Sequence, residues 1–463
     1  MQCDANPALY TADELDAHLA RILHLTEQLL AAPDRKLLQI SLLTAQALTV
    51  QAERQTATRR HWPEMSLGAL LASGLETGKG MVVCDGLGGL TRDAFHRHQQ
   101  VIMTFLNNSG IGPGKLVALA LPRDRRMMLC VATIAATGAA WLPIDIEAPQ
   151  NRARLILEDA RPALVLLPDT DHLGWACGYE AWCLDAFELT PCRIAANTKP
   201  LGKIGTVPPD TAYVTYTSGT TGRPKGVIIP RKALLNFLHS IRETLDFGSD
   251  ETLLAVTTWT FDIAVLEILL PLASGSRCVI ASSADVRDPG RLTALIRTHR
   301  VTAMQATPTL WQTLFGTAAS EALQGLLLLS GGESMPAHLA RQMSSVGRAV
   351  YNLYGPTETT IWSTAHRLAP DEPDTPPAGR PLANTRLYIT DRSGGLLPDG
   401  VVGELMIAGD GVATGYLNRP ALTASRFVPD PESSTGALAY RTGDRAALDS
   451  RGLLSILGRL ISR

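Results

Sequence analysis

Apolar and polar residues alternate along the chain in blocks that predict helices and strands in turn. Residues 92–107 have the pattern of a helix, and 117–121 and 163–167 are short apolar runs typical of buried strands. The same alternation returns between residues 211 and 329. Strands that alternate with helices form parallel sheets with helices on both faces. We therefore expect an α/β fold with two doubly wound α/β subdomains.

The two ends of the chain have different patterns. Thr11, followed three residues later by Glu14, predicts a capped helix whose apolar stripe needs a partner surface. A polar stretch at 51–61 then indicates a boundary before the main body. After about Pro370, short runs such as 385–390 predict strands between turn residues. We expect a small subdomain there, rich in β-strands and similar to a barrel.

These patterns divide the chain into four predicted parts. A leading segment covers residues 1–60, and the two α/β subdomains cover 61–200 and 201–370. The β-rich subdomain covers 371–463. The length of 463 residues, roughly three times the ~150 typical of one domain, is consistent with several folded units.

Composition excludes several classes of function. The chain has 42 basic and 44 acidic residues, and a formal charge of -2 provides no basic surface for nucleic acid. Residues 127–144 carry no charge, but Gly138 and Pro143 divide them into a buried helix, a turn and a strand, so we expect no membrane span. The 7 cysteines are scattered without a CxxC pair. Free thiols favour a cytoplasmic protein.

One stretch has the composition of a phosphate-binding loop. Residues 213–226 read YVTYTSGTTGRPKG, a strand that leads into glycines and hydroxyl residues. Glycines let the backbone approach a ligand, hydroxyls and amides donate hydrogen bonds, and Lys225 adds a positive charge. A Walker A loop is excluded because Pro224 precedes the lysine and Gly226 follows it. A flexible surface loop is the alternative.

The sequence SGTTGRPKG at 218–226 resembles the signature of the adenylate-forming superfamily. Further motifs resemble, in the same order, those of nonribosomal peptide synthetase adenylation domains: ATGAAWLPID at 136–145, FD at 261–262, NLYGPTE at 352–358, GEL at 403–405, GYL at 415–417 and YRTGD at 440–444. The resemblance covers about residues 65–459 and implies the large N-terminal core of that fold. Residues 1–50 resemble the tail of a condensation domain and its linker.

The resemblance implies a reaction between ATP and an amino acid. The carboxylate attacks the α-phosphorus and gives aminoacyl-AMP and pyrophosphate, so the site must neutralise phosphate charge. Glu358 matches the family's Mg²⁺ ligand, and Thr357 would hydrogen-bond the α-phosphate. Thr217 and Lys225 complete the expected catalytic set. The alternative for Glu358 is an exposed acidic residue of a loop.

The resemblance also implies a nucleotide site. Tyr354 would stack on adenine, Asn352 would recognise its amino group, and Asp444 would accept the ribose hydroxyls. Core packing is the alternative for Tyr354, and a solvent-facing turn is the alternative for Asp444. The complete expected set is Ser218, Gly219, Thr220, Thr221, Gly222, Gly331, Gly332, Asn352, Tyr354, Asp444 and Arg459.

Asp262 determines which class of acid is expected. In amino-acid-activating relatives this position binds the substrate ammonium, which disfavours a fatty-acid or aryl coenzyme A ligase. Capping of the following helix is the structural alternative. Alignment predicts a pocket with one charge and otherwise uncharged walls, which favours glycine first and cysteine, serine or alanine next. The predicted pocket residues are Asp262, Ile263, Leu266, Ala306, Leu328, Ser330, Leu353, Ile361 and Trp362, where Ala306 and Leu328 have core packing as their alternative.

The family continues into a small C-terminal subdomain with an essential lysine, which we expect to be absent from this chain. A module that binds ligands with little turnover is therefore a second hypothesis. The expected partners are condensation and carrier-protein domains in cis. Residues 421–427 also resemble the region where MbtH-like proteins dock.

Overall fold

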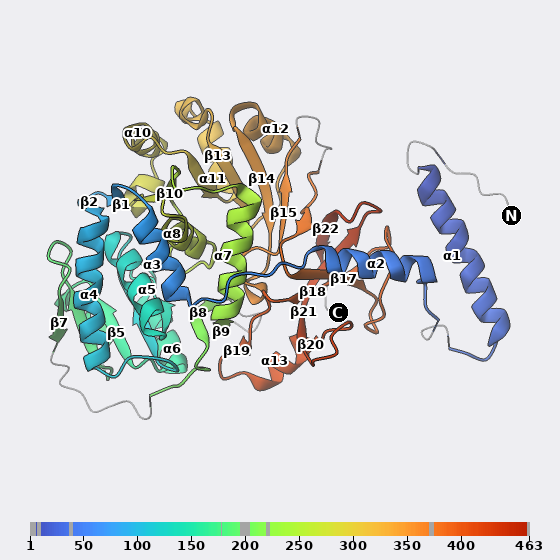
Figure 1. Cartoon of the computed structure of the whole chain (residues 1–463), viewed down its shortest axis with the longest axis horizontal. Helices are drawn as coiled ribbons and strands as arrows, with labels where there is room; N and C mark the ends of the chain where they lie inside the picture. Colours follow the sequence, from blue (N-terminus) through green and yellow to red (C-terminus); the bar gives the residue numbers. More distant parts are fainter. Residues whose placement is uncertain are drawn as a thin grey trace.

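The computed structural model describes residues 6, 11–36, 40–176, 178–194, 204–218, 223–369 and 375–460. Within these residues the chain forms three β-sheets and the helices that cover them (Figure 1). Two sheets have parallel centres, and the third is antiparallel. The structure confirms the predicted mixed α/β fold with a β-rich part near the end of the chain.

The first sheet has nine strands in the described part of the chain, in the order β16-β15-β14-β13-β12-β10-β11-β1-β2. The strands from β14 to β1 are parallel, and β2, β15 and β16 pair antiparallel at the edges. The central strands are apolar because helices bury both faces. The strands are β1 (Met81–Asp85), β2 (Gly88–Thr91), β10 (Thr252–Ala255), β11 (Arg277–Ile280), β12 (Ala303–Ala306), β13 (Leu327–Gly331), β14 (Ala349–Tyr354), β15 (Thr364–Arg367) and β16 (Arg380–Pro381).

The second sheet has eight described strands in the order β19-β9-β8-β4-β3-β5-β6-β7. They are β3 (Leu116–Leu119), β4 (Ala140–Pro143), β5 (Leu164–Leu167), β6 (Ala181–Leu184), β7 (Pro191–Ile194), β8 (Thr211–Thr217), β9 (Lys225–Pro230) and β19 (Gly415–Tyr416). The sheets exchange strands across residue 200, because β1 and β2 belong to the first sheet and β8 and β9 to the second. The predicted subdomain boundary at residue 200 therefore does not coincide with the division between the sheets.

Helices fill the space between these two sheets and cover their outer faces. One continuous apolar core joins both sheets to α3 (Leu67–Thr77), α4 (Arg92–Asn108), α5 (Arg125–Thr137), α7 (Arg231–Leu245) and α8 (Ile263–Ser274). A second core lies on the other face of the first sheet, under α10 (Pro289–His299), α11 (Pro308–Phe315) and α12 (Ala337–Val346), with α9 (Ser283–Val286) beside them. Helix α6 (Gln150–Ala160) and the 3₁₀ turn Thr170–Trp175 lie beside the outer core of the second sheet.

The third sheet contains five strands among the described residues, in the order β17-β18-β21-β20, with β22 paired to β21. These are β17 (Thr385–Thr390), β18 (Gly403–Gly409), β20 (Phe427–Pro429), β21 (Leu438–Leu448) and β22 (Leu454–Arg459), and α13 (Pro420–Arg426) precedes β20. Burial alternates along most of β21, whereas the central residues of β18 are all buried because apolar clusters cover both faces of the sheet there.

The uncharged segment 127–144 divides as predicted. Helix α5 ends at Thr137, Gly138 follows with φ of 74°, and β4 begins at Ala140. Glycine adopts this left-handed backbone without steric cost, and it ends the helix. Among the helices in the described ranges, none is both long and apolar enough to span a bilayer.

The leading segment forms two helices, α1 (Ala12–Ala31) and α2 (Ala45–Ala57). The predicted capping box at Thr11 and Glu14 is present. The apolar stripe of α1 is partly exposed, and 78% of Leu30 is accessible. Helix α1 lies apart from the main body (Figure 1).

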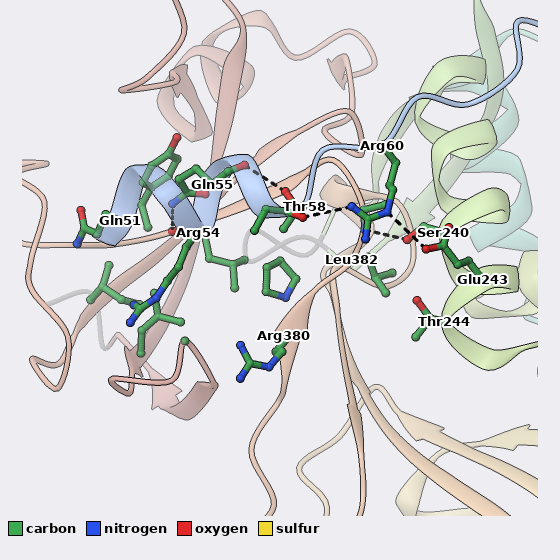
Figure 2. A pocket seen from close by; sticks show the side chains of 18 of the residues that line it. Gln51, Arg54, Gln55, Thr58, Arg60, Ser240, Glu243, Thr244, Arg380 and Leu382 are labelled. Carbon is green, nitrogen blue, oxygen red and sulfur yellow. Dashed lines mark hydrogen bonds and ion pairs between the residues drawn. The ribbon is translucent and has the colours of Figure 1, made fainter. Parts of the chain in front are cut away.

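The polar stretch 51–61 is a helix end and an extended strap that dock on the main body. Gln55 donates to the carbonyl of Leu387 at 2.9 Å, and Arg60 pairs with Glu243 of α7 at 3.4 Å. A cavity of about 300 Å³ lies between α2, α7 and the third sheet (Figure 2). None of the predicted site residues lines this cavity.

Candidate active site

The predicted phosphate loop connects the antiparallel strands β8 and β9. Thr217 ends β8 and Lys225 begins β9, and the two residues are partners in the register. The hydroxyl oxygen of Thr217 is buried and has no hydrogen-bond partner among the described residues. Ser218 is exposed, and residues 219–222 of the predicted set lie outside the described part of the chain.

Glu358 lies in the 3₁₀ turn Thr357–Thr359, directly after β14, and is only 5% exposed. Lys225 donates to its Oε1 at 2.6 Å, and the Tyr416 hydroxyl donates to the same oxygen at 2.7 Å. Burial alone would raise the pKa of Glu358, but the charge and hydrogen bond of Lys225, together with Tyr416, lower it below its ordinary value. Glu358 is therefore a buried carboxylate, which excludes its alternative as an exposed loop acid.

Tyr416 is a site residue to which the sequence analysis assigned no role. Its hydroxyl accepts from Lys225 at 3.1 Å, its ring lies 4.5 Å from the lysine nitrogen, and the Tyr440 hydroxyl is 3.5 Å away. Both tyrosines lie in quoted motifs, GYL and YRTGD. Their motif positions were the only sequence signal, because the contact joins strands far apart in the chain.

A second polar cluster joins the first and third sheets. The Tyr354 hydroxyl donates to Oδ2 of Asp444 at 2.6 Å, and Nε of Arg459 donates to Oδ1 at 2.9 Å. Asp444 is 8% exposed, whereas the Arg459 side chain is 74% exposed. The structure thus brings together three residues that the sequence analysis assigned to the nucleotide site, and it places Asp444 in a partly enclosed position.

Asn352 and the two glycines lie near this cluster on neighbouring strands. Asn352 of β14 pairs in register with Ser330 of β13, one residue before Gly331. Its Nδ2 donates to the carbonyl of Pro377 at 2.8 Å, which leaves its amide oxygen as the group that can accept from a ligand. Gly332 has φ of 85°, a conformation that favours glycine.

Asp262 occupies the position before the first residue of α8. Its side chain makes no capping hydrogen bond, and its Oδ2 is buried without a partner in the described chain. The capping alternative is therefore wrong. Burial raises the pKa of Asp262 to about 6, the charge of Glu358 adds to the increase, and the nearby Thr357 hydroxyl opposes it.

The hydroxyl of Tyr213 is a second polar group near Asp262 that has no partner among the described residues. It is buried, and burial together with the Asp262 charge raises its pKa. Because buried polar groups are normally paired, two unpaired oxygens close together indicate a place that a polar ligand completes. Sequence analysis quoted Tyr213 only as the start of the loop motif.

Five of the apolar residues predicted for the pocket belong to the same core face as α8. Ile263 and Leu266 come from α8, Leu353 from β14, and Ile361 and Trp362 from the segment after the 3₁₀ turn. Ile361 has φ of 70°, which is unusual for a β-branched residue and typical of strained functional segments.

The other three predicted pocket residues lie elsewhere. Ala306 and Leu328 belong to the core on the opposite face of the first sheet, and Ser330 shares the strand face of Leu328. Side chains alternate between the two faces of a strand, so an alignment shifted by one residue selects the wrong face. Assigning these three residues to the pocket is wrong for that reason.

The correct strand face carries Gln305, Leu329 and Gly331. Gln305 and Leu329 are register partners, Leu329 belongs to the same core as α8, and Gln305 donates to the carbonyl of Ile263 at 2.9 Å. A Cβ on Gly331 would lie 2.5 Å from the Trp362 ring. Trp362 is therefore packed directly over a glycine, and there is no room for a side chain at position 331.

These features are a buried ion pair, a Tyr354–Asp444–Arg459 cluster and a buried oxygen of Asp262 that has no partner among the described residues. Residues 79–417 match the model of the AMP-binding enzyme family. Because this match covers most of the chain, the protein belongs to the AMP-binding enzyme family.

Relatives of known name are longer than this chain. It is 39% identical over 459 residues to the dimodular nonribosomal peptide synthase of Bacillus subtilis (strain 168), covering 98% of this chain and 19% of that protein. It is 32% identical over 470 residues to enterobactin synthase component F of Shigella flexneri, covering 98% and 36%. The chain thus spans a minor part of each relative.

Solved structures show the same likeness. The crystal structure of holo-AB3403, a four-domain nonribosomal peptide synthetase bound to AMP and glycine, matches with a TM-score of 0.81 and 30% identity, covering 97% of this chain and 33% of that one. The form of FmoA3 bound to alpha-methyl-L-serine-AMP matches with a TM-score of 0.84 and 30% identity, covering 97% and 51%. The chain is thus similar in sequence and fold to a part of these nonribosomal peptide synthetases.

Proposed function

We propose that this chain is the adenylation unit of a nonribosomal peptide synthetase and activates glycine. It would bind ATP with Mg²⁺, join the amino-acid carboxylate to AMP, release pyrophosphate and present the product to a carrier protein. The observation that carries this proposal is the buried Oδ2 of Asp262, which has no partner among the described residues and lies at the start of α8, the helix that shares a core with Trp362.

An amino acid supplies what Asp262 lacks. A substrate ammonium would pair with the carboxylate, and a hydrogen bond to a charged group contributes about 1.5 to 3 kcal/mol. A fatty or aryl acid has no such group and would leave the carboxylate unpaired. This favours an amino acid over the substrates of coenzyme A ligases.

The size of the pocket supports glycine. Gly331 is in close contact with Trp362, and the five apolar wall residues offer a ligand no free hydrogen-bonding group, because the Trp362 indole already donates to Gln305. Glycine would be chosen by exclusion of larger side chains, because one methylene is worth only about 1 to 3 kcal/mol in discrimination. Alanine, serine and cysteine are the next candidates. The glycine in AB3403 is compatible with this order.

The nucleotide roles follow from the polar clusters. Asp444 and Arg459 would hold the ribose, Tyr354 and Asn352 the adenine, and Thr217 a phosphate oxygen. Within the described residues, no group of three metal-binding side chains is present. A single carboxylate, Glu358, suits Mg²⁺, which is commonly held by one or two carboxylates together with phosphates and water.

Lys225 and Glu358 neutralise each other in the ligand-free chain. Glu358 would hold Mg²⁺ together with the nucleotide phosphates, and Lys225 would then contact a phosphate. Substitution of Glu358 by Gln removes one charged oxygen ligand. It should weaken Mg²⁺-dependent nucleotide binding, and unchanged affinity in a magnesium titration would contradict this role.

The remaining proposals concern the larger assembly. We propose condensation and carrier domains as partners in cis, a cytoplasmic location, and an MbtH-like protein that contacts the region of α13. Copurification of this chain with such a protein, compared with a variant altered in α13, tests the last proposal.

A thermal-shift panel of non-hydrolysable acyl-adenylate analogues tests the proposed function. A ligand that binds only the folded state raises the unfolding temperature even without turnover. We expect the largest shift in unfolding temperature with the glycyl analogue and a smaller one with the alanyl analogue. The fatty-acyl and benzoyl analogues should give a shift equal to that of AMP alone. Trp362→Ala should increase the shifts with larger aminoacyl analogues. A larger shift with a phenylalanyl, lysyl or fatty-acyl analogue than with the glycyl one would refute the proposal.

A further inference from the structure

A chain of buried hydrogen bonds lies behind the amino-acid pocket. Glu267 of α8 and Gln305 of β12 are both 0% exposed, and Trp362 is 2% exposed. Nε2 of Gln305 donates to Oε1 of Glu267 at 3.2 Å, and Nε1 of Trp362 donates to Oε1 of Gln305 at 2.9 Å. The indole that closes the pocket is thus connected to a buried carboxylate.

The chemistry of the three groups determines which group donates and which accepts in each of these hydrogen bonds. An ionised carboxylate only accepts hydrogen bonds, and an indole N–H only donates. The amide between them must therefore turn its nitrogen to Glu267 and its oxygen to Trp362. The same nitrogen donates to the carbonyl of Ile263 at 2.9 Å. A reversed amide would lose all three contacts.

Glu267 also holds the loop that leads to Asp262. Its Oε2 accepts from the backbone N–H groups of Val256 and Thr257 at 2.9 and 3.0 Å, and its Oε1 accepts from the Thr257 hydroxyl at 2.6 Å. Burial raises the pKa of Glu267 above its ordinary value, and these donors together with the positive charge of Arg123 oppose that rise. The Glu267 carboxylate therefore contacts both the loop that leads to Asp262, which would bind the substrate ammonium, and Gln305, which holds the Trp362 indole.

We propose that Glu267 is a positioning residue that sets the size limit of the amino-acid pocket by orienting the Gln305 amide against the Trp362 indole. Glu267 itself does not touch the substrate. This inference rests on the proposed function, because the size limit is read from the preference for glycyl over alanyl adenylate.

The variant Glu267→Gln replaces one hydrogen-bond acceptor of residue 267 by a donor and keeps the shape of the side chain. The new amide can keep its oxygen toward the two backbone N–H groups, but its NH₂ group then faces the NH₂ group of Gln305. The Gln305 amide must turn or move away, and Trp362 loses its acceptor. Thr257→Val is the matched control, because it removes one donor to Glu267 and leaves the Gln305 contact in place.

The experiment measures by calorimetry the dissociation constants of AMP and of non-hydrolysable glycyl and alanyl adenylate analogues. We expect Glu267→Gln to reduce the glycyl preference by about tenfold, since a methylene is discriminated by about that factor. AMP affinity should stay within about twofold in both variants, and the preference of Thr257→Val should stay within about twofold of the parent.

A second variant keeps the test decisive if Glu267→Gln does not fold. Gln305→Met has a similar shape and removes the middle of the hydrogen-bonded chain, so it should reduce the preference to a similar extent. If both single variants fold, the double variant should show no further loss, because residues that act through one contact are not additive.

The outcomes separate the two proposals. If the parent chain binds neither aminoacyl analogue more tightly than AMP, the proposed function is refuted. If the parent prefers the glycyl analogue, and Glu267→Gln, or Gln305→Met in its place, keeps that preference, the positioning role is refuted while the function stands. Additive losses in the double variant would also overturn the positioning role.

Discussion

Glu358 and Asp262 are two buried carboxylates of one site, but their surroundings are opposite. Glu358 accepts from Lys225 and Tyr416, and these contacts lower its pKa despite burial. Asp262 has an oxygen without a partner in the described part of the chain, and burial raises the pKa of Asp262 to about 6. The protein itself supplies the partners of the Glu358 carboxylate, whereas one oxygen of Asp262 is left for a ligand to complete.

This difference suggests different roles for the two carboxylates, one in keeping the site ordered and the other in selecting the substrate. The Lys225–Glu358 pair can hold the phosphate side in place before nucleotide binds, because both charges are already compensated. The unpaired carboxylate of Asp262 is costly in the free protein, and that cost is relieved only by a ligand with a cation in the right place. Selection of the substrate class is therefore expected to depend on Asp262.

Asp262→Asn should have the largest effect on ligand binding. Loss of the charged partner should weaken the glycyl-adenylate analogue by about 10- to 150-fold, which corresponds to about 1.5 to 3 kcal/mol. AMP affinity should change less, because AMP has no ammonium group for Asp262 to pair with. Calorimetry with both ligands measures the difference, and an equal loss for AMP would contradict the separation.

Gly331→Ala tests the contact that limits pocket volume. The added Cβ would meet the Trp362 ring and the Leu353 carbonyl at 2.5 Å, so we expect a loss of about 1 to 3 kcal/mol in the free energy of unfolding. Gly248→Ala is the control, because its Cβ would enter open space. Denaturant unfolding compares the two variants, and equal stability would contradict the tight contact.

The opposite pKa shifts predict opposite responses to pH. The folded pKa of Asp262 is raised, so its contribution to stability is present below about pH 4 and is lost as the pH rises through about 6. The folded pKa of Glu358 is lowered, so its contribution is present at neutral pH and is lost on acidification below its ordinary value. Binding of the glycyl analogue needs ionised Asp262 and should weaken about tenfold between pH 7 and pH 5. Calorimetry across this range measures the slope, and the same slope in Asp262→Asn would contradict the assignment.

Tyr416→Phe should have the smallest effect. It removes one hydrogen bond to Glu358 but leaves the Lys225 pair, so we expect a loss of about 0.5 to 1.5 kcal/mol in Mg²⁺-dependent binding of a non-hydrolysable ATP analogue. Tyr179→Phe, whose hydroxyl bonds to Leu157 away from the site, is the control. Titration with Mg²⁺ checks both variants, and an equal effect in the control would indicate a general structural loss.

The sequence predicted those parts of the molecule that depend on local pattern. Periodicity identified α5, its end at Gly138 and strand β4, and motifs identified Lys225, Glu358 and Asp262. The contact between Tyr416 and Glu358 was not predictable, because it depends on how distant strands pack. The same limit applies to the exchange of strands β1, β2, β8 and β9 between the two sheets.

The choice of residues for the pocket walls shows more clearly what could not be predicted from the sequence. Ala306, Leu328 and Ser330 differ from Gln305, Leu329 and Gly331 by one position, and both sets lie on buried, largely apolar strands. Burial on both faces removes the alternation that would mark one face as the pocket. Only the packing of Trp362 and α8 against one side identifies the correct set.

The most direct test combines removal of the ligand ammonium with removal of the Asp262 charge. The dissociation constants of a glycyl-adenylate analogue and its acetyl counterpart, which lacks the amino group, are measured on the parent chain and on Asp262→Asn. We predict that the parent prefers the glycyl analogue by about 10- to 150-fold and that Asp262→Asn loses this preference. Equal binding of the two analogues by the parent, or an unchanged preference in Asp262→Asn, would show that Asp262 does not select an amino acid.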